Sequence, residues 1–224
     1  MYALSPCFER RARTAFVAVL LLGVLSPFLV AADAPGSPFP GLELVTSKNI
    51  GALYRRPDVD TSAYSKILIA EPAVEFSKNW NPRNYGTFGL SAARVTKIRL
   101  DLASMAKSVF AKALTDGGYE IVTEVGDGVL AITPNIVNVF INAPDVPASG
   151  QSRTYTLDAG SATLALQVND AVTGTLLAVA LDQRRSGSSR MQWATSTSNR
   201  AAASDMLKGW AEQLKRELDA ARDK

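Results

Sequence analysis

Histidine is absent from the 224-residue sequence, and this absence removes the commonest forms of side-chain chemistry. Histidine is the most frequent general base and the most frequent ligand of transition metals in proteins. A Ser-His-Asp triad, a Cys-His pair and a histidine zinc site are therefore excluded within this sequence. What remains is the chemistry of carboxylates, of serine–lysine pairs, and of hard cations bound by oxygen atoms.

Two carboxylates, Glu71 and Glu75, have the spacing that comes nearest to a catalytic pair. Residues four apart on a strand point to the same face of a sheet, and two acids on one face could hydrolyse a glycoside. The alternative is that this half of the strand faces water, which is where charged residues usually lie. We favour the second interpretation and predict no catalytic residue here.

A second acidic cluster, Asp58 and Asp60 in the segment DVD, has the spacing with which a calcium-binding loop begins. The next residues, TSAY, supply no glycine for the sharp turn of such a loop, and no bidentate glutamate follows at the required spacing. We therefore interpret the segment as a turn. The glycines in GDG and TDGG also lack nucleotide-binding spacing. We predict no catalytic, cofactor-binding or metal-binding residues, no cofactor, and no enzymatic activity.

The net charge of +3 does not indicate a nucleic-acid partner. Residues 1–32 contain three of the 24 basic and one of the 21 acidic residues, which leaves 21 basic and 20 acidic residues in the nearly neutral remainder. The basic residues between 94 and 112 would scatter around a helix axis at about 100° per residue instead of forming one stripe. We expect no nucleic-acid binding.

Residues 1–32 have the pattern of a secretory signal peptide. Three arginines precede an uncharged apolar run over residues 14–32, and the small residues at its end fit cleavage before Asp33. The single cysteine, Cys7, precedes the run, so no lipidation cysteine follows it. We expect export to the periplasm by a cleavable signal peptide. The alternative is an inner-membrane anchor formed by uncleaved residues 14–32, which would then be the only membrane contact.

The remaining chain is predicted to form one α+β domain over residues 51–221, after a Pro/Gly-rich tether over residues 33–50. A mostly antiparallel sheet of about five strands should pack with two amphipathic helices in the order β-α-β-β-β-β-α. The expected elements are a strand at 66–76, a helix at about 95–113, strands at 119–125 and 129–142, a hairpin at 161–185, and a helix at about 200–221.

Apolar periodicity is clearest in the two helices and the hairpin. In the hairpin, Leu164, Leu166 and Val168 alternate with polar residues and should lie on the buried face. Ser198 or Asn199 could cap the last helix. In the strand expected at 129–142, the apolar alternation changes phase near Pro134, which indicates a bulge or an edge strand. The helices repeat apolar residues every three or four positions: Val95, Ile98, Leu102, Met105, Val109 and Ala113 in the first, and Ala203, Leu207, Trp210, Leu214 and Leu218 in the second.

Several segments resemble one known family. They are LYRRPDVDTSAYSKILIAEP, AKALTDGGYEIVTEVGDGVLAITPNIVNV, GSATLALQVNDAVTGTLLAVALDQRRSG and WAEQLKREL, which together span residues 51–218. The most specific piece is DAVTGTLLA followed by Asp182 and Arg184. On these segments the chain is similar to the bacterial envelope family named domain of unknown function 3313. The resemblance implies an exported protein, often a lipoprotein, although the missing lipidation cysteine departs from that pattern. It carries over no catalytic residue.

Two hypotheses for function follow. The first is a non-enzymatic binding or accessory module of the periplasm or envelope, whose partner is an unknown envelope protein or cell-envelope component. The second is an exported carboxylate-dependent hydrolase, which would need paired acids at the mouth of an apolar pocket, one of them with a raised pKa. We interpret the segment LYRRPDVDTSAY as a structural segment that leads into the first strand. Pro57 restricts the backbone of the preceding residue, Arg56, to an extended conformation.

Overall fold

The computed structural model of the protein describes residues 37–57, 59–85, 88–142, 155–193 and 196–222. Only the backbone is described for residues 155–159, 188–193 and 196. The chain divides into two units, Met1–Ala32 and Asp33–Lys224, and the account below concerns the second alone. The predicted signal peptide at residues 1–32, the first residues of the predicted tether, and Asp58 lie outside the described residues.

Eight strands in the described part of the chain form one mixed, mostly antiparallel sheet. Its order is β1-β2-β8-β7-β6-β3-β5, and β4 pairs with β6 beyond the end of β3. β3 runs parallel to both β5 and β6, and β4 is parallel to β6, whereas the other pairs are antiparallel. The strands are β1 Glu43–Val45, β2 Ala52–Arg55, β3 Lys66–Ile69, β4 Val74–Phe76, β5 Glu120–Val122, β6 Val129–Ile141, β7 Tyr155–Asp170 and β8 Leu176–Trp193.

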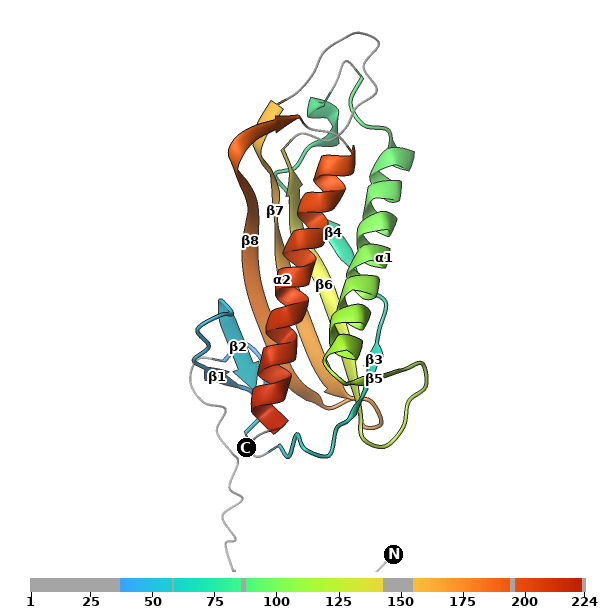
Figure 1. Cartoon of the computed structure of the whole chain (residues 1–224), viewed down its shortest axis with the longest axis vertical. Helices are drawn as coiled ribbons and strands as arrows, with labels where there is room; N and C mark the ends of the chain where they lie inside the picture. The colour runs from blue at the N-terminus through green and yellow to red at the C-terminus, as the bar shows by residue number, and fades with distance from the viewer. Residues whose placement is uncertain (1–36, 58, 86–87, 143–154, 194–195, 223–224) are drawn as a thin grey trace, which may run out of the picture. The chain divides into compact units, whose positions relative to one another are not determined.

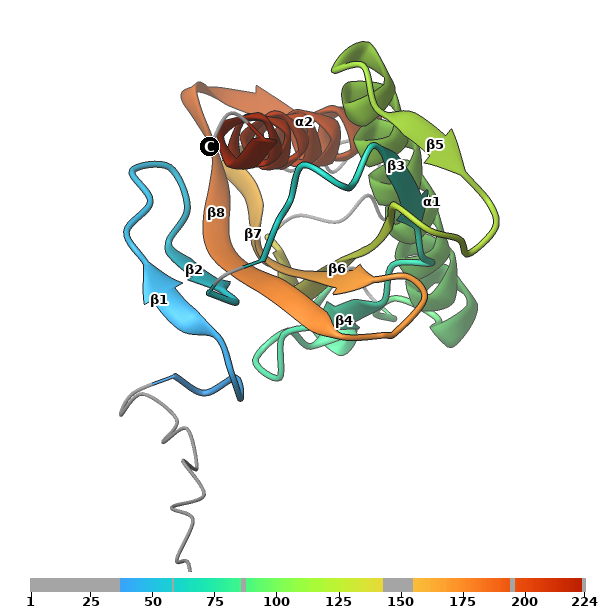
Figure 2. The same ribbon diagram turned by 90° about the horizontal axis from the view of Figure 1, so that it is seen from below.

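Two helices, α1 (Ala92–Asp116) and α2 (Ser196–Arg222), lie side by side on one face of this sheet (Figure 1). Seen from below, β8, β7 and β6 curve around the side on which the helices pack (Figure 2). The Ser91 side chain caps α1 by accepting a hydrogen bond from the Arg94 amide, and Gly118 ends it with a φ of 85°. A 3₁₀ turn, η1 (Pro82–Asn84), precedes α1.

The predicted α+β class and the order of elements after α1 are confirmed, but the prediction of about five strands was wrong. Two extra strands, β1 and β2, precede β3, and β1 lies within the segment predicted as a tether. The strand predicted at residues 66–76 is two strands, β3 and β4. Pro72 lies between them, and the Ala73 amide donates to the Asn135 side chain instead of a sheet partner.

The α1 residues that contact the core are one position away from the predicted stripe. The fully buried residues are Ala103, Ala106, Phe110 and Leu114, whereas the predicted ones are only half-buried. Two alanines at the point of contact let the helix approach the sheet closely. The predicted stripe flanks this contact, and Ile98, Leu102 and Met105 instead line a cleft between the helices.

The predicted phase change in β6 is a bulge, located at Asn138 and not at Pro134. Pro134 pairs with Leu166 within the strand, and the register shifts between Val137 and Phe140. Asn138 has a φ of 52°, which asparagine tolerates better than most residues. Gly160 on β7 faces the bulge with a φ of 153°, and a Cβ there would overlap the carbonyl oxygen of Phe140. The bulge therefore requires glycine at this position.

The predicted hairpin is confirmed and is longer than expected, since β8 continues through the polar stretch that ends at Trp193. The predicted caps, Ser198 and Asn199, were wrong because α2 already begins at Ser196. Leu164, Leu166 and Val168 are buried as predicted.

Replacing Leu166 by alanine should lower the free energy of unfolding by about 2–4 kcal/mol, because its side chain is only 2% exposed and a cavity would remain. Gln167→Ala, on the opposite face of the same strand, should cost less than about 0.5 kcal/mol because that side chain is exposed. Urea denaturation of both variants measures the difference. Equal costs would contradict the assigned strand faces.

Candidate ligand-binding site

The acidic residues that the sequence offered as catalytic candidates do not meet in a cavity. Glu71 follows β3 with its side chain 70% exposed, and its Oε2 lies 2.9 Å from Lys107 Nζ on α1. Glu75 is exposed on β4, and neither glutamate lines either of the two cavities described below. Asp60 accepts hydrogen bonds from the Ser62 hydroxyl and amide, which lower the pKa of its carboxyl, as expected for a turn.

The segment around Asp60 forms hydrogen bonds to the ends of several helices and strands. The Tyr64 hydroxyl donates to Asp170 Oδ2 at 2.8 Å, and the Arg56 side chain donates to the Leu176 carbonyl at 2.9 Å. Both acceptors flank the β7–β8 turn. Burial and then the Asp170 hydrogen bond raise the pKa of Tyr64. Thr61 donates to the carbonyl of Ala221 near the end of α2. These contacts agree with a structural role.

A cleft of about 390 Å³ lies between the amino-terminal turns of α1 and α2, over β6 and β7. We call it the α1–α2 cleft. Its volume is within the range of about 300–1,000 Å³ typical of small-molecule sites. Its apolar wall comes from both helices and the sheet: Ile98, Leu102, Met105, Ile136, Val139, Phe140, Ile141, Ala162, Ala202, Ala203, Met206, Leu207 and Trp210.

The cleft exists because the helices fill the core only along their later turns. The buried residues of α1 begin at Ala103, and those of α2 begin at Leu207. No described side chain in the earlier turns of either helix is fully buried. On the α2 side the wall includes Ala202 and Ala203, which are too small to reach across to α1. The sheet side includes Gly160, which the bulge requires.

Charged residues lie at the mouth of the α1–α2 cleft, and most are basic. Among the described residues, Arg94, Lys97 and Arg200 line it together with one acid, Asp101. Asp101 accepts from Lys97 Nζ at 2.9 Å and from Arg200 Nη2 at 3.2 Å, so its carboxylate bridges the two helices. The Lys97 and Arg200 side chains are 68% and 64% exposed. The cleft thus combines an apolar interior with a basic rim.

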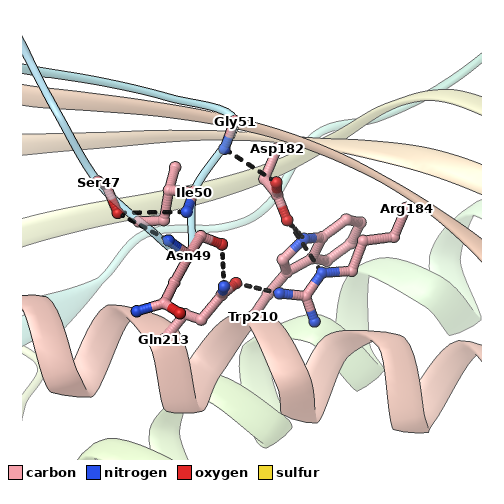
Figure 3. A network of polar contacts seen from close by, with 8 residues as sticks. All are labelled: Ser47, Asn49, Ile50, Gly51, Asp182, Arg184, Trp210 and Gln213. Atoms are coloured by element: carbon pink, nitrogen blue, oxygen red, sulfur yellow. Dashed lines mark hydrogen bonds and ion pairs between the residues drawn. The ribbon is translucent and has the colours of Figure 1, made fainter.

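A second polar cluster connects β8, α2 and the segment before β2 (Figure 3). Asp182, whose side chain is 13% exposed, accepts hydrogen bonds from Trp210 Nε1 at 2.8 Å, Arg184 Nε at 2.9 Å and the Gly51 amide at 3.1 Å. Gln213 accepts from Arg184 and donates to the carbonyl of Asn49. Three donors on one carboxylate hold it in place, so the arrangement is that of a structural joint.

Beside this cluster is a cavity of only about 80 Å³, lined mainly by core residues such as Leu53, Leu164 and Leu214. It is well below the usual size of a ligand site. The sequence resemblance had singled out Asp182 and Arg184 without assigning them a role. The sequence analysis did not identify Gly209, a glycine inside helix α2, as part of this cluster. A Cβ at this position would overlap the Arg184 guanidinium, so the glycine makes room for the arginine side chain.

The described residues contain no group of three or more His, Cys, Asp or Glu side chains arranged to hold a metal ion. Among the same residues, no helix is long and apolar enough to cross a membrane.

The chain belongs to the family described as Protein of unknown function (DUF3313), whose model matches residues 37–214. No curated protein matches the sequence.

Three solved structures show weak similarity to the chain. Protein XCC0632 from Xanthomonas campestris is 15% identical with a TM-score of 0.40, and the match covers 72% of this chain and 86% of that one. The PelC dodecamer from Paraburkholderia phytofirmans is 11% identical with a TM-score of 0.33, covering 75% and 96%. A minor lipoprotein from Acinetobacter baumannii is 11% identical with a TM-score of 0.34, covering 71% and 95%. Similarity at this level carries no information about function.

Proposed function

We propose that this chain is a non-enzymatic binding module of the bacterial cell envelope, and that its ligand site is the α1–α2 cleft. The observation that carries the proposal is the cleft itself, about 390 Å³ of space with a mainly apolar wall. Space of this kind is rare in a close-packed protein and usually has a ligand. The signal-peptide pattern of residues 1–32 supports a periplasmic location. Anchoring in the inner membrane through residues 14–32 is the alternative.

The charges in the cleft favour binding over carboxylate-dependent hydrolysis. A glycoside hydrolase of the usual kind needs two carboxyl groups about 5–9.5 Å apart across the scissile bond. Among the described residues, Asp101 is the one acid that lines the α1–α2 cleft, and it is paired with Lys97 and Arg200. The hydrolase hypothesis would require a second acid, which the described lining of the cleft does not supply.

Filling the cleft should weaken the binding of a neutral apolar probe. We expect the purified protein to bind N-phenyl-1-naphthylamine saturably, with a rise in probe fluorescence. Ala203→Phe would place a phenyl ring in the space that the probe needs. Forcing both into the cleft should cost about 1–3 kcal/mol of binding free energy, so we expect the affinity to fall at least about tenfold.

Ala201→Phe is the matched control, since the same bulk is added to the same helix at an exposed position outside the cleft. It should bind the probe like the unmodified protein, and thermal unfolding should show that both variants fold. The proposal fails if the unmodified protein shows no saturable binding, or if Ala203→Phe binds as well as Ala201→Phe.

A further inference from the structure

We propose that the ligand of the α1–α2 cleft is a free single-chain amphiphile with a compact anionic head group. Its apolar chain would lie in the cleft, and its head would be held at the mouth by Lys97 and Arg200. This inference rests on the proposed function and adds the chemical class of the ligand to it.

The interior of the cleft suits a flexible hydrocarbon chain better than a rigid or polar ligand. Its walls come from α1, α2, β6 and β7 and are predominantly aliphatic. Met105 and Met206 lie on opposite helices, and methionine adapts its unbranched side chain to irregular or variable shapes. A volume of about 390 Å³ is at the small end of the usual range for ligand sites, which favours one chain over two.

The mouth of the cleft already binds a carboxylate, and this shows what kind of head group it can hold. Lys97 Nζ and Arg200 Nη2 converge from two different helices on Asp101. A guanidinium has five N–H donors and an ammonium has three, so both groups can contact a second anion as well as Asp101. Two cations thus face one carboxylate in this ion-pair cluster, which leaves an excess of positive charge among its three members.

The Asp101 bridge does not prevent entry of such a ligand. The Lys97 and Arg200 side chains are well exposed to solvent and the Asp101 side chain is 38% exposed, and ion pairs at such a surface contribute little to stability. An anionic head can therefore share or replace the Asp101 contacts at low cost. A cationic head would be repelled by the excess positive charge. A neutral head could accept a hydrogen bond from these cations but would lack the attraction between opposite charges that an anionic head adds.

Calorimetric titration with decanoate and decan-1-ol, two ligands that differ only in the head group, tests the inference. We expect decanoate to bind at least about tenfold more tightly than decanol. The double variant Lys97→Gln/Arg200→Gln should lose about tenfold in decanoate affinity and stay within about twofold for decanol. Asp101→Asn, which removes the competing acid, should bind decanoate more tightly than the unmodified protein does.

Lys112→Gln is the matched control, because Lys112 and Asp116 form the same i,i+4 ion pair on α1 away from the cleft. It should leave both affinities unchanged. Equal binding of decanoate and decanol, or tighter binding of decyltrimethylammonium, would overturn the anionic head group while leaving the proposed function intact. Binding of none of these ligands would contradict the proposed function itself. Co-sedimentation with phosphatidylglycerol vesicles, without binding of free decanoate, would replace the free amphiphile by a membrane surface.

Discussion

Replacing Trp210 by alanine is expected to lower the free energy of unfolding by about 3–5 kcal/mol. The Trp210 side chain is 1% exposed and belongs to the main core cluster, so its removal leaves a large cavity between α2 and the sheet. Its indole also donates to Asp182, and the Arg184 guanidinium lies 5.6 Å from the centre of its ring. Because domains are typically stable by only about 5–15 kcal/mol, urea denaturation should show a protein close to unfolding.

Trp210→Phe separates the packing of the ring from the hydrogen bond. Phenylalanine keeps most of the apolar contact but has no N–H, so Asp182 would keep only the donors from Arg184 and Gly51. We expect a smaller loss, about 1–3 kcal/mol, the usual cost of leaving a buried polar group short of a partner. If alanine costs no more than phenylalanine at this position, the ring is not the main contribution of Trp210 to the joint between α2 and β8.

The parts of the fold that the sequence predicts are those with long periodic patterns. The β7–β8 hairpin repeats its alternation through Leu164, Leu166 and Val168, and α2 repeats its apolar positions through Leu207, Trp210 and Leu214. β1 and β2 were missed because strands of three and four residues contain too little alternation to be distinguished from a loop. The Pro/Gly-rich residues just before β1 also favoured a tether there.

The shifted face of α1 has a different cause. Ala103 and Ala106 carry almost no hydrophobic signal, yet they are buried because small residues allow the closest approach between helix and sheet. The larger apolar residues beside them, Ile98, Leu102 and Met105, are directed to the cleft instead. The spacing of apolar residues identifies the apolar face of a helix. It does not show which side of that face contacts the sheet.

The candidate site could not be predicted from sequence because its parts are brought together only by the packing of distant elements. Asp101 and Arg200 are 99 positions apart, and their contact depends on α1 and α2 lying side by side. Each residue alone has the appearance of an ordinary surface charge on a helix. The space beneath them reflects side chains that are too small to fill it, and sequence periodicity does not record unfilled volume.

Deleting residues 196–224, and with them α2, should leave a chain that no longer unfolds cooperatively. The helix buries Leu207, Trp210, Ala211 and Leu214 in the core, so its removal exposes the sheet face that it covers. We expect an insoluble or molten product that binds anilinonaphthalene sulfonate and lacks near-ultraviolet circular dichroism. In the intact protein, tryptophan emission should be blue-shifted and independent of protein concentration, because the fold itself buries Trp210.

The deletion also removes hydrogen bonds that tie α2 to segments far apart in the sequence. Ser47 donates to Glu217, Thr61 donates to the Ala221 carbonyl, and the Tyr119 hydroxyl donates to Asp219. The hydrogen bond from Lys215 contributes most to lowering the pKa of Asp219, and the hydrogen bond from Tyr119 lowers it further. These two hydrogen bonds to Asp219 contribute their full stabilisation at pH values above the unfolded pKa of about 4. That stabilisation is lost as the pH falls through the lower pKa of the folded protein.

A truncated chain that still unfolds in one cooperative step would show that α2 is a docking element for a partner and not part of the core.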